Sequence, residues 1–193
     1  MTNIFLASAS PRRKQLLAQL GLDVQVIPND SEEHLNAGET AEAYVLRVAQ
    51  EKAQSGWKFL PPLTSDPLLL AADTAVVVGE NVLGKPLDES DARQMWQLLS
   101  GNTHQVLTAV VITDGTTEHS IVQTSLVTMR DISSAEMHRY WNSGEPFDKA
   151  GGYAVQGLGA VFICELKGSY SGVMGLPLYE TAQLLNRFGV SVV

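Results

Sequence analysis

The sequence predicts an α/β protein in which helices flank a mixed, twisted β-sheet. Short apolar runs that suit strands alternate with stretches whose apolar residues recur at helical spacing. Two long runs rich in β-branched residues also flank Asp114-Gly115, a pair that is typical of a hairpin loop and predicts antiparallel neighbours. Helices together with hairpin strands favour a mixed sheet over a purely parallel one.

In the first half of the chain, turn and capping residues separate the elements. Hydroxyl residues and Pro11 open the first helix and Gly21 ends it, while Gly56 is expected to close the second helix. Pro61-Pro62 marks a surface connection ahead of the longest apolar run. The elements expected here are strand 4–7, helix 11–20, strand 24–27, helix 40–55, strand 68–78 and a returning strand at 82–83.

The second half follows the same pattern. Asp88 suits the cap of a helix, and Ser133 with Glu136 has the spacing of a capping box. A glycine-rich stretch, 151–159, precedes an apolar run that contains Cys164, which we expect to be buried there as a small hydrophobic residue. The elements expected here are helix 88–99, strands 104–113 and 121–130, helix 133–143, strand 160–166 and helix 178–188.

Composition limits the classes of partner. The chain has 13 Lys and Arg against 21 Asp and Glu, a net charge of −8, so it has no electrostatic reason to bind nucleic acid or an anionic membrane. Its 193 residues can bury one core, or two lobes that share a cleft. A single cysteine, no signal peptide and no membrane span predict a cytoplasmic protein.

Two charged residues interrupt otherwise apolar patterns. Asp73 lies within the apolar run 68–78, so its carboxylate must be paired, hydrogen-bonded, bound to a metal or exposed in a cleft. A structural aspartate that caps a neighbouring turn is the alternative. Lys52 continues the apolar face of the second helix. It either reaches into a cleft or extends its ammonium to water at a favourable position for the helix dipole.

The segment Ser8–Arg13 joins the first strand to the first helix and predicts an anion site. A helix N-terminus has free N–H groups, and Ser8 and Ser10 add hydroxyls beside it. Arg12 and Arg13 add guanidinium groups that match phosphate oxygens. A capped helix with two solvated arginines is the structural alternative.

Gly79–Lys85 matches the first seven positions of a phosphate-binding P-loop. Pro86 stands where that motif needs a hydroxyl, and no helix is expected before Asp88. We therefore reject a P-loop and keep Lys85 as a candidate that Pro86 holds in an extended chain.

Several short motifs together resemble the Maf family of nucleoside triphosphate pyrophosphatases, in order and over residues 3 to about 188. The motifs are Ser8-x-Ser10-Pro11-Arg12-Arg13, Arg47-x-x-x-x-Lys52, Ala72-Asp73-Thr74, Gly84-Lys85-Pro86, Ser100-Gly101 and Asp148-Lys149-Ala150-Gly151. The pairs Arg12-Arg13 and Asp73-Thr74, with Tyr153-x-x-Gln156-Gly157, are similar to the subgroup that acts on dTTP and UTP.

The resemblance implies a fold and a reaction. The fold would be one domain over residues 1–193, related to inosine triphosphate pyrophosphatases, with two lobes around a central nucleotide-binding cleft. The reaction would be hydrolysis of dTTP and UTP between the α- and β-phosphates, which releases the monophosphate and pyrophosphate and cleanses nucleotide pools.

Carried over by position, the resemblance also gives catalytic roles. Asp73 would be the general base for the attacking water, and Glu33 with Asp73 would hold a divalent cation, Mg²⁺ or Mn²⁺. Lys52, Lys85 and Arg13 would bind the phosphates and stabilise charge as it moves onto pyrophosphate.

The remaining candidates would bind the substrate and select the base. Ser8 and Ser10 belong to the binding set, and Arg12, Thr74 and Gln156 would set base specificity. A carboxamide can accept from N3–H and donate to O4 of uracil or thymine, although a flipped amide suits cytosine.

Two alternatives remain open. The family's association with blocked septum formation allows a non-catalytic nucleotide-binding regulator, and a related pyrophosphatase could act on another nucleotide. A base together with two lysines favours chemistry over sensing. A homodimer is what the resemblance implies, and neither nucleic acid nor membrane is expected as a partner.

Overall fold

The computed structural model describes residues 3–31, 33–62 and 64–192 of the chain. Its strands lie close to the runs that the sequence predicts. They are β1 (Asn3–Ala7), β2 (Gln25–Ile27), β3 (Pro67–Val78), β4 (Asn81–Leu83), β5 (Thr103–Thr113), β6 (Glu118–Met129) and β7 (Ile163–Lys167).

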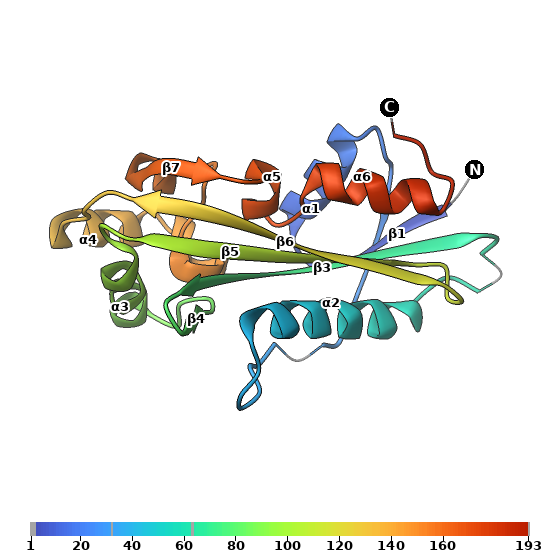
Figure 1. Ribbon diagram of the computed structural model, residues 1–193, viewed down its shortest axis with the longest axis horizontal. Helices are drawn as coiled ribbons and strands as arrows, with labels where there is room; N and C mark the ends of the chain where they lie inside the picture. The colour runs from blue at the N-terminus through green and yellow to red at the C-terminus, as the bar shows by residue number, and fades with distance from the viewer. Residues whose placement is uncertain (1–2, 32, 63, 193) are drawn as a thin grey trace. The chain divides into compact units, whose positions relative to one another are not determined.

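Within the described residues these strands form one seven-stranded sheet in the order β2-β1-β3-β5-β6-β7, with β4 paired to β3 (Figure 1). β1 is parallel to β2 and β3, whereas β4 is antiparallel to β3 and β7 to β6. The α/β class with a mixed sheet is therefore confirmed.

The five helices that the sequence predicts appear in the expected order, and the described residues add one short α-helix and three 3₁₀ helices. The α-helices are α1 (Pro11–Gln19), α2 (Ala41–Trp57), α3 (Glu89–Leu99), α4 (Ser134–Asn142), α5 (Tyr170–Val173) and α6 (Leu178–Arg187), and the 3₁₀ helices are η1 (Glu145–Asp148), η2 (Ala150–Gly152) and η3 (Leu158–Phe162). The predicted five are α1, α2, α3, α4 and α6. Among the described helices, none combines the length and hydropathy needed to cross a bilayer.

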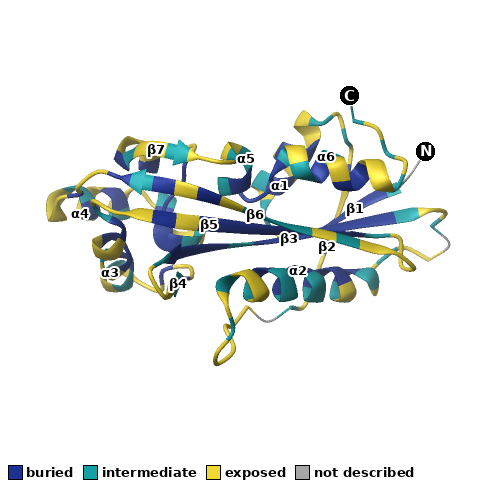
Figure 2. Cartoon of the chain, viewed as in Figure 1, coloured by how far each residue is buried: buried dark blue, intermediate teal, exposed yellow. Residues whose placement is uncertain are grey.

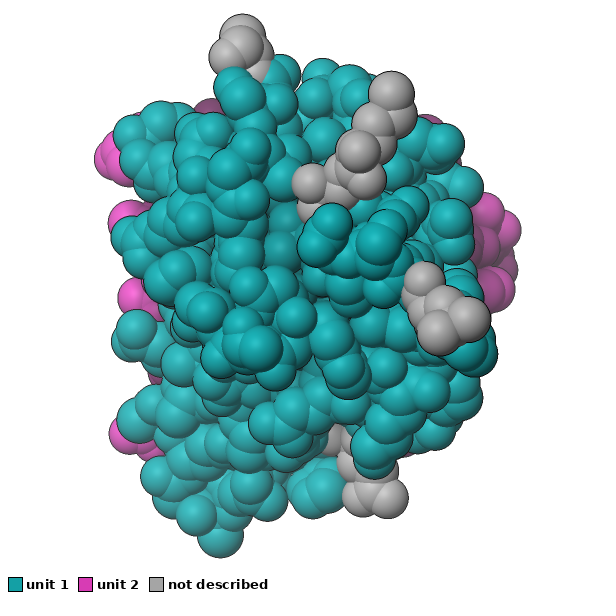
Figure 3. Space-filling view, turned by 90° about the vertical axis from the view of Figure 1, so that its right-hand side faces the viewer, with its two compact units in different colours: residues 1–73, 108–123, 175–193 teal, residues 74–107, 124–174 magenta. Residues whose placement is uncertain are grey.

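The chain separates into two compact units, coloured separately in Figure 3. Unit 1 comprises residues 1–73, 108–123 and 175–193, and unit 2 comprises residues 74–107 and 124–174. The long strands β3, β5 and β6 each begin in one unit and end in the other.

In unit 1, helices cover both faces of the sheet. Figure 1 shows α2 on one face and α1 with α6 on the other. The described residues of β1 and the unit-1 part of β3 are accordingly almost all buried (Figure 2). Strands covered on both faces have continuous apolar sequences rather than alternating ones, which explains the uninterrupted run ahead of Asp73.

Gly56 lies inside α2 rather than at its end, so the prediction that it closes this helix is wrong. A Cβ atom on Gly56 would lie 2.6 Å from the Cβ of Ala7 on β1. Glycine is therefore needed for close packing of α2 on β1, and the helix continues to Trp57.

The core of unit 2 contains a cluster of aromatic rings among aliphatic side chains. The ring of Tyr140 on α4 lies 5.2 Å from the rings of both Trp96 on α3 and Phe162. The indole N–H of Trp96 donates to the carbonyl oxygen of Gly152 at 3.0 Å. The Ser133 capping box at the start of α4 is present as predicted.

The strand expected at 160–166 is shorter and its cysteine is not buried. Residues Leu158–Phe162 form η3, so β7 begins only at Ile163. Cys164 lies on β7, the last strand in the sheet order of the described residues, and is exposed. The prediction of a buried thiol is therefore wrong.

Candidate active site

A buried lysine in unit 1 joins two carboxylates. The Nζ atom of Lys52 donates to Oδ1 of Asp73 at 2.8 Å and to Oε1 of Glu33 at 2.6 Å. Lys52 is only 5% exposed and Asp73 only 6%. Pairing is what the burial of each charge requires, and the ammonium ends among carboxylates rather than in bulk water.

The fold explains why these side chains meet. Lys52 is on the face of α2 that packs against the sheet, on the same side of the helix as the buried Val45, Val48 and Ala49. Leu69 of β3 packs near α2 at Gly56. Asp73 is four residues further along the same strand and therefore faces the same side.

Glu33 lies in the loop between β2 and α2, and one arginine ties that loop to α2. Arg47 donates to both carboxylate oxygens of Glu39, at 2.7 and 2.8 Å, and to the carbonyl oxygen of His34 at 2.9 Å. The hydrogen bonds from Arg47 lower the pKa of Glu39 to about 2. Arg47 belongs to a motif noted in the sequence, but its role as a loop anchor was not predicted.

Arg13 is buried rather than solvated, contrary to the structural alternative considered for it. Its Nη1 donates to Oγ of Ser8 at 3.0 Å and its Nε to the carbonyl oxygen of Gly175 at 2.8 Å. Oγ of Ser8 also accepts from the backbone N–H of Ser10. Ser10 is the N-cap of α1, but its side chain makes no capping bond, and Arg12 is half-buried.

The charges of this cluster influence one another. Burial lowers the pKa of Arg13, while the negative charges of Asp73 and Glu33 oppose that shift. Burial raises the pKa of Tyr44 to about 12, and the same two carboxylates contribute to the rise. Two cations and two carboxylates therefore share one electrostatic environment within unit 1.

This arrangement suits phosphate chemistry. Lys52 and Arg13 offer N–H donors to phosphate oxygens, and Arg13 is already oriented by Ser8. Among the described residues, no group of three or more His, Cys, Asp or Glu side chains could hold a metal. The two carboxylates nevertheless fit Mg²⁺, which is commonly bound through one or two carboxylates with waters and substrate phosphates.

The other lysine candidate, Lys85, lies in unit 2, in the loop that follows β4, and is exposed. β4 pairs with β3 as a hairpin, which agrees with rejection of a P-loop. The carbonyl oxygen of Gly84 accepts from the N–H of Gly151 at 2.9 Å, and Pro86 is buried. The backbone on both sides of Lys85 is thus held.

The remaining specificity candidates also belong to unit 2. Thr74 is half-buried on β3, and Gln156 is exposed in an irregular turn. By unit, the predicted site residues are Ser8, Ser10, Arg12, Arg13, Glu33, Lys52 and Asp73 in unit 1, and Thr74, Lys85 and Gln156 in unit 2.

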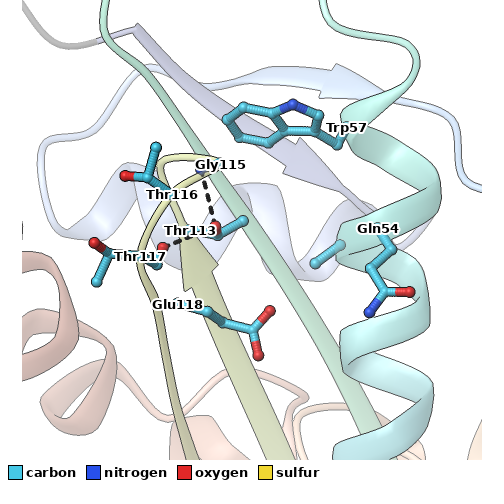
Figure 4. A pocket seen from close by; sticks show the side chains of 8 residues that line it. Gln54, Trp57, Thr113, Gly115, Thr116, Thr117 and Glu118 are labelled. Carbon is cyan, nitrogen blue, oxygen red and sulfur yellow. Dashed lines mark hydrogen bonds between the residues drawn. The ribbon is translucent and has the colours of Figure 1, made fainter.

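Unit 1 also has a hollow of about 340 Å³ between the end of α2 and the β5–β6 hairpin, shown in Figure 4. Trp57 and Gln54 line one side, and the hairpin residues Thr113 and Glu118 lie opposite. Its lining contains no cation, and Glu118 already accepts from Gln50. The hollow therefore does not suit a triphosphate.

The chain is similar to a known protein family over nearly its whole length. The family model described as "Maf-like protein" matches residues 3–188. A dTTP/UTP pyrophosphatase of Pseudoalteromonas atlantica is 50% identical over 188 residues, which cover 97% of this chain and 98% of that protein. A dTTP/UTP pyrophosphatase of Saccharophagus degradans is 48% identical over 98% of this chain and 90% of its own. The solved Staphylococcus aureus Ham1 protein aligns with a TM-score of 0.45 and 16% identity, over 67% of this chain and 73% of that one.

Proposed function

The chain belongs to the Maf family, and we propose that it is a nucleoside triphosphate pyrophosphatase that converts dTTP and UTP to the monophosphate and pyrophosphate. The observation that carries the proposal is the buried Lys52 ammonium between Asp73 and Glu33. In this cluster the candidate phosphate-binding lysine lies within hydrogen-bond distance of the candidate base, Asp73, and of Glu33, the other candidate cation ligand. The names of the near-full-length relatives supply the substrates.

Substrate binding begins with charge. A nucleoside triphosphate brings about four negative charges, which must be offset by cations at the site. Lys52 and Arg13 supply two, and Arg12 and Lys85 add two more in the proposed set. When bound to Glu33 and Asp73, a divalent cation supplies further neutralisation of the phosphates. Ser8 holds the Arg13 fork in place.

Asp73 acts as the general base in this proposal. It takes a proton from a water molecule as the water oxygen forms a bond to the α-phosphorus. The bond from that phosphorus to the bridging oxygen breaks, and its electron pair leaves with pyrophosphate. Lys52, Lys85 and Arg13 stabilise the charge that develops on the leaving group. Thr74, Arg12 and Gln156 select the pyrimidine, and Ser10 completes the binding set.

Product analysis tests the proposal directly. The purified protein is incubated with Mg²⁺, and separately with Mn²⁺, and a panel of nucleoside triphosphates, and pyrophosphate is separated from orthophosphate. We expect monophosphate and pyrophosphate, formed fastest from dTTP and UTP. Orthophosphate with a nucleoside diphosphate would overturn the assigned bond. Nucleotide binding without turnover would favour the non-catalytic regulator. A homodimer and a link to septum formation stay predictions from the resemblance, and a cytoplasmic location stays a prediction from the sequence composition.

A further inference from the structure

Gln156, the proposed base-selecting residue, lies on a segment without helix or strand. It is exposed, while the three residues before it are buried. A site residue on an irregular segment is precise only if its backbone is held by other groups. The contacts that hold this backbone therefore bear on base selection.

Two side chains outside the segment accept from backbone N–H groups on both sides of Gln156. The N–H of Ala154 donates to Oη of Tyr140 at 3.1 Å. The N–H groups of Leu158 and Gly159 donate to the Glu145 carboxylate at 2.7 and 2.9 Å. Oη of Tyr140 donates to Oε1 of Glu145 at 2.7 Å, which joins the two anchors. We call this pair the Glu145–Tyr140 clasp.

Two glycines that follow Gln156 lie close to the clasp. A Cβ atom on Gly157 would lie 2.0 Å from Oε2 of Glu145. One on Gly159 would lie 2.6 Å from Oη of Tyr140. A side chain at either position would displace these two polar groups, and at Gly159 its Cβ would also lie 2.9 Å from the carbonyl oxygen of Ala154.

The clasp itself is rigidly supported. The Tyr140 ring packs between Trp96 and Phe162 and is only 5% exposed. Burial alone would raise the pKa of Glu145, but hydrogen bonds from Tyr140 and from two backbone N–H groups outweigh it and lower the pKa. Glu145 is thus an ionised acceptor for three donors, and charge-assisted bonds of this kind are stronger than neutral ones.

We propose that Glu145 and Tyr140 are positioning residues that fix the backbone on both sides of Gln156 and so set the preference for dTTP and UTP. The proposal rests on the proposed function, because it acts through the assigned role of Gln156. Neither residue is required to touch the substrate. Loosening the clasp should therefore lower the preference for dTTP and UTP. It should have less effect on the rate of hydrolysis of a nucleotide that Gln156 does not select.

The experiment compares Glu145→Ala, Glu145→Gln and Tyr140→Phe with the wild type. The measurement is kcat/KM for UTP, CTP and ATP with Mg²⁺. We expect the UTP/CTP and UTP/ATP ratios to fall about tenfold in Glu145→Ala, mainly through KM for UTP. The same ratios should fall less in Glu145→Gln, which keeps one acceptor oxygen, and in Tyr140→Phe, which keeps the ring. Loss of folded protein alone would lower all three rates equally and leave both ratios unchanged.

Gln156→Ala and the double variant Glu145→Ala/Gln156→Ala decide whether the clasp acts through Gln156. If it does, Glu145→Ala should change the ratios less than about twofold in the Gln156→Ala background. The inference would be overturned if the fold-changes of the two single variants simply multiplied in the double variant. It would also be overturned if all three clasp variants left the nucleotide ratios unchanged. If Gln156→Ala itself leaves the ratios unchanged, the assigned role of Gln156 fails, and the inference fails with it. Absence of pyrophosphate release from the wild type would instead refute the proposed function.

Asp114 provides the matched control. Its carboxylate accepts from the backbone N–H groups of Thr116 and Thr117 in the β5–β6 hairpin, at 2.8 and 2.7 Å. Asp114→Ala therefore removes the same kind of loop anchor from a segment that carries no proposed site residue. Its nucleotide ratios should equal those of the wild type, and a fall as large as that of Glu145→Ala would contradict a specific role for the clasp.

Discussion

At the position of Asp73, a carboxylate and a carboxamide have almost the same shape but differ in their ability to take a proton. Asp73→Asn keeps an oxygen that can accept from Lys52, so the buried contact at 2.8 Å is retained. We expect turnover of UTP to fall by about 10²- to 10⁴-fold, the range typical of a lost general base. Binding of Mg–UTP, measured by calorimetry, should remain detectable.

Asp114→Asn serves as the control for that substitution, since it makes the same chemical change at an exposed hairpin. It should keep full turnover. Near-normal turnover by Asp73→Asn would remove Asp73 from the role of base. Loss of both turnover and Mg–UTP binding would assign it to substrate or cation binding instead.

Single residues that break a pattern could be found from the sequence, whereas anchoring residues could not. Asp73 interrupts an apolar strand and Lys52 an apolar helix face, and both are buried in one ion cluster. Arg47 and Glu145 break no pattern, because charged side chains are ordinary on a helix surface and in a loop. Arg47 is important because it binds Glu39, and Glu145 because it accepts from two backbone N–H groups further along the chain. No local spacing in the sequence encodes these partners.

At the scale of elements, strand and helix order follows directly from apolar periodicity and capping residues. The errors lie where tertiary contacts decide. Gly56 has the sequence signature of a helix end, but it serves the contact with β1. The apolar run 160–166 looks like one strand, but its first residues form η3, and Cys164 on the shortened strand is exposed.

The close contact between α2 and β1 yields a prediction at the same scale. Gly56→Ala should place a methyl group 2.6 Å from the Cβ of Ala7, so the helix must shift. Overpacking of this kind costs about 1–3 kcal/mol, which exceeds the gain of about 1 kcal/mol from helix propensity. We expect a net loss of stability in urea unfolding, together with reduced turnover, because α2 carries Lys52.

The double variant Ala7→Gly/Gly56→Ala tests the cause. It removes the methyl group on β1 that collides with the new one, so it should recover turnover toward the wild-type value. It should also recover stability relative to the expected sum of the two single changes. If the two substitutions were simply additive, the α2–β1 contact would not explain the effect of Gly56→Ala.

The whole molecule carries a net negative charge, whereas the proposed site contains several cationic side chains. A net charge of −8 repels a polyanionic substrate at long range. The proposed site offsets that repulsion locally with the buried Arg13 and Lys52, the half-buried Arg12 and the exposed Lys85. Strong attraction is thus expected only for a ligand that can reach these groups, as a small phosphorylated substrate would.

We expect the two units to unfold together, as one domain spanning the chain. β3, β5 and β6 each run from one unit into the other, so neither unit can lose its strands without disturbing the other. The three tryptophans allow a test, because Trp57 belongs to unit 1 and Trp96 and Trp141 to unit 2. In Trp57→Phe, urea unfolding followed by fluorescence reports unit 2, and far-UV circular dichroism reports the whole chain. Coincident midpoints are expected.

Bound substrate should raise the free energy of unfolding without separating the fluorescence midpoint from the circular dichroism midpoint. A ligand that binds only the folded state stabilises it by mass action, so Mg–UTP at about 100 times its Kd should stabilise the fold by about 2.7 kcal/mol. In Trp57→Phe, the fluorescence and circular dichroism midpoints should then move by the same amount. A fluorescence midpoint separated from the circular dichroism midpoint, or moved differently by Mg–UTP, would show that the units unfold independently, and the single-domain proposal would be wrong.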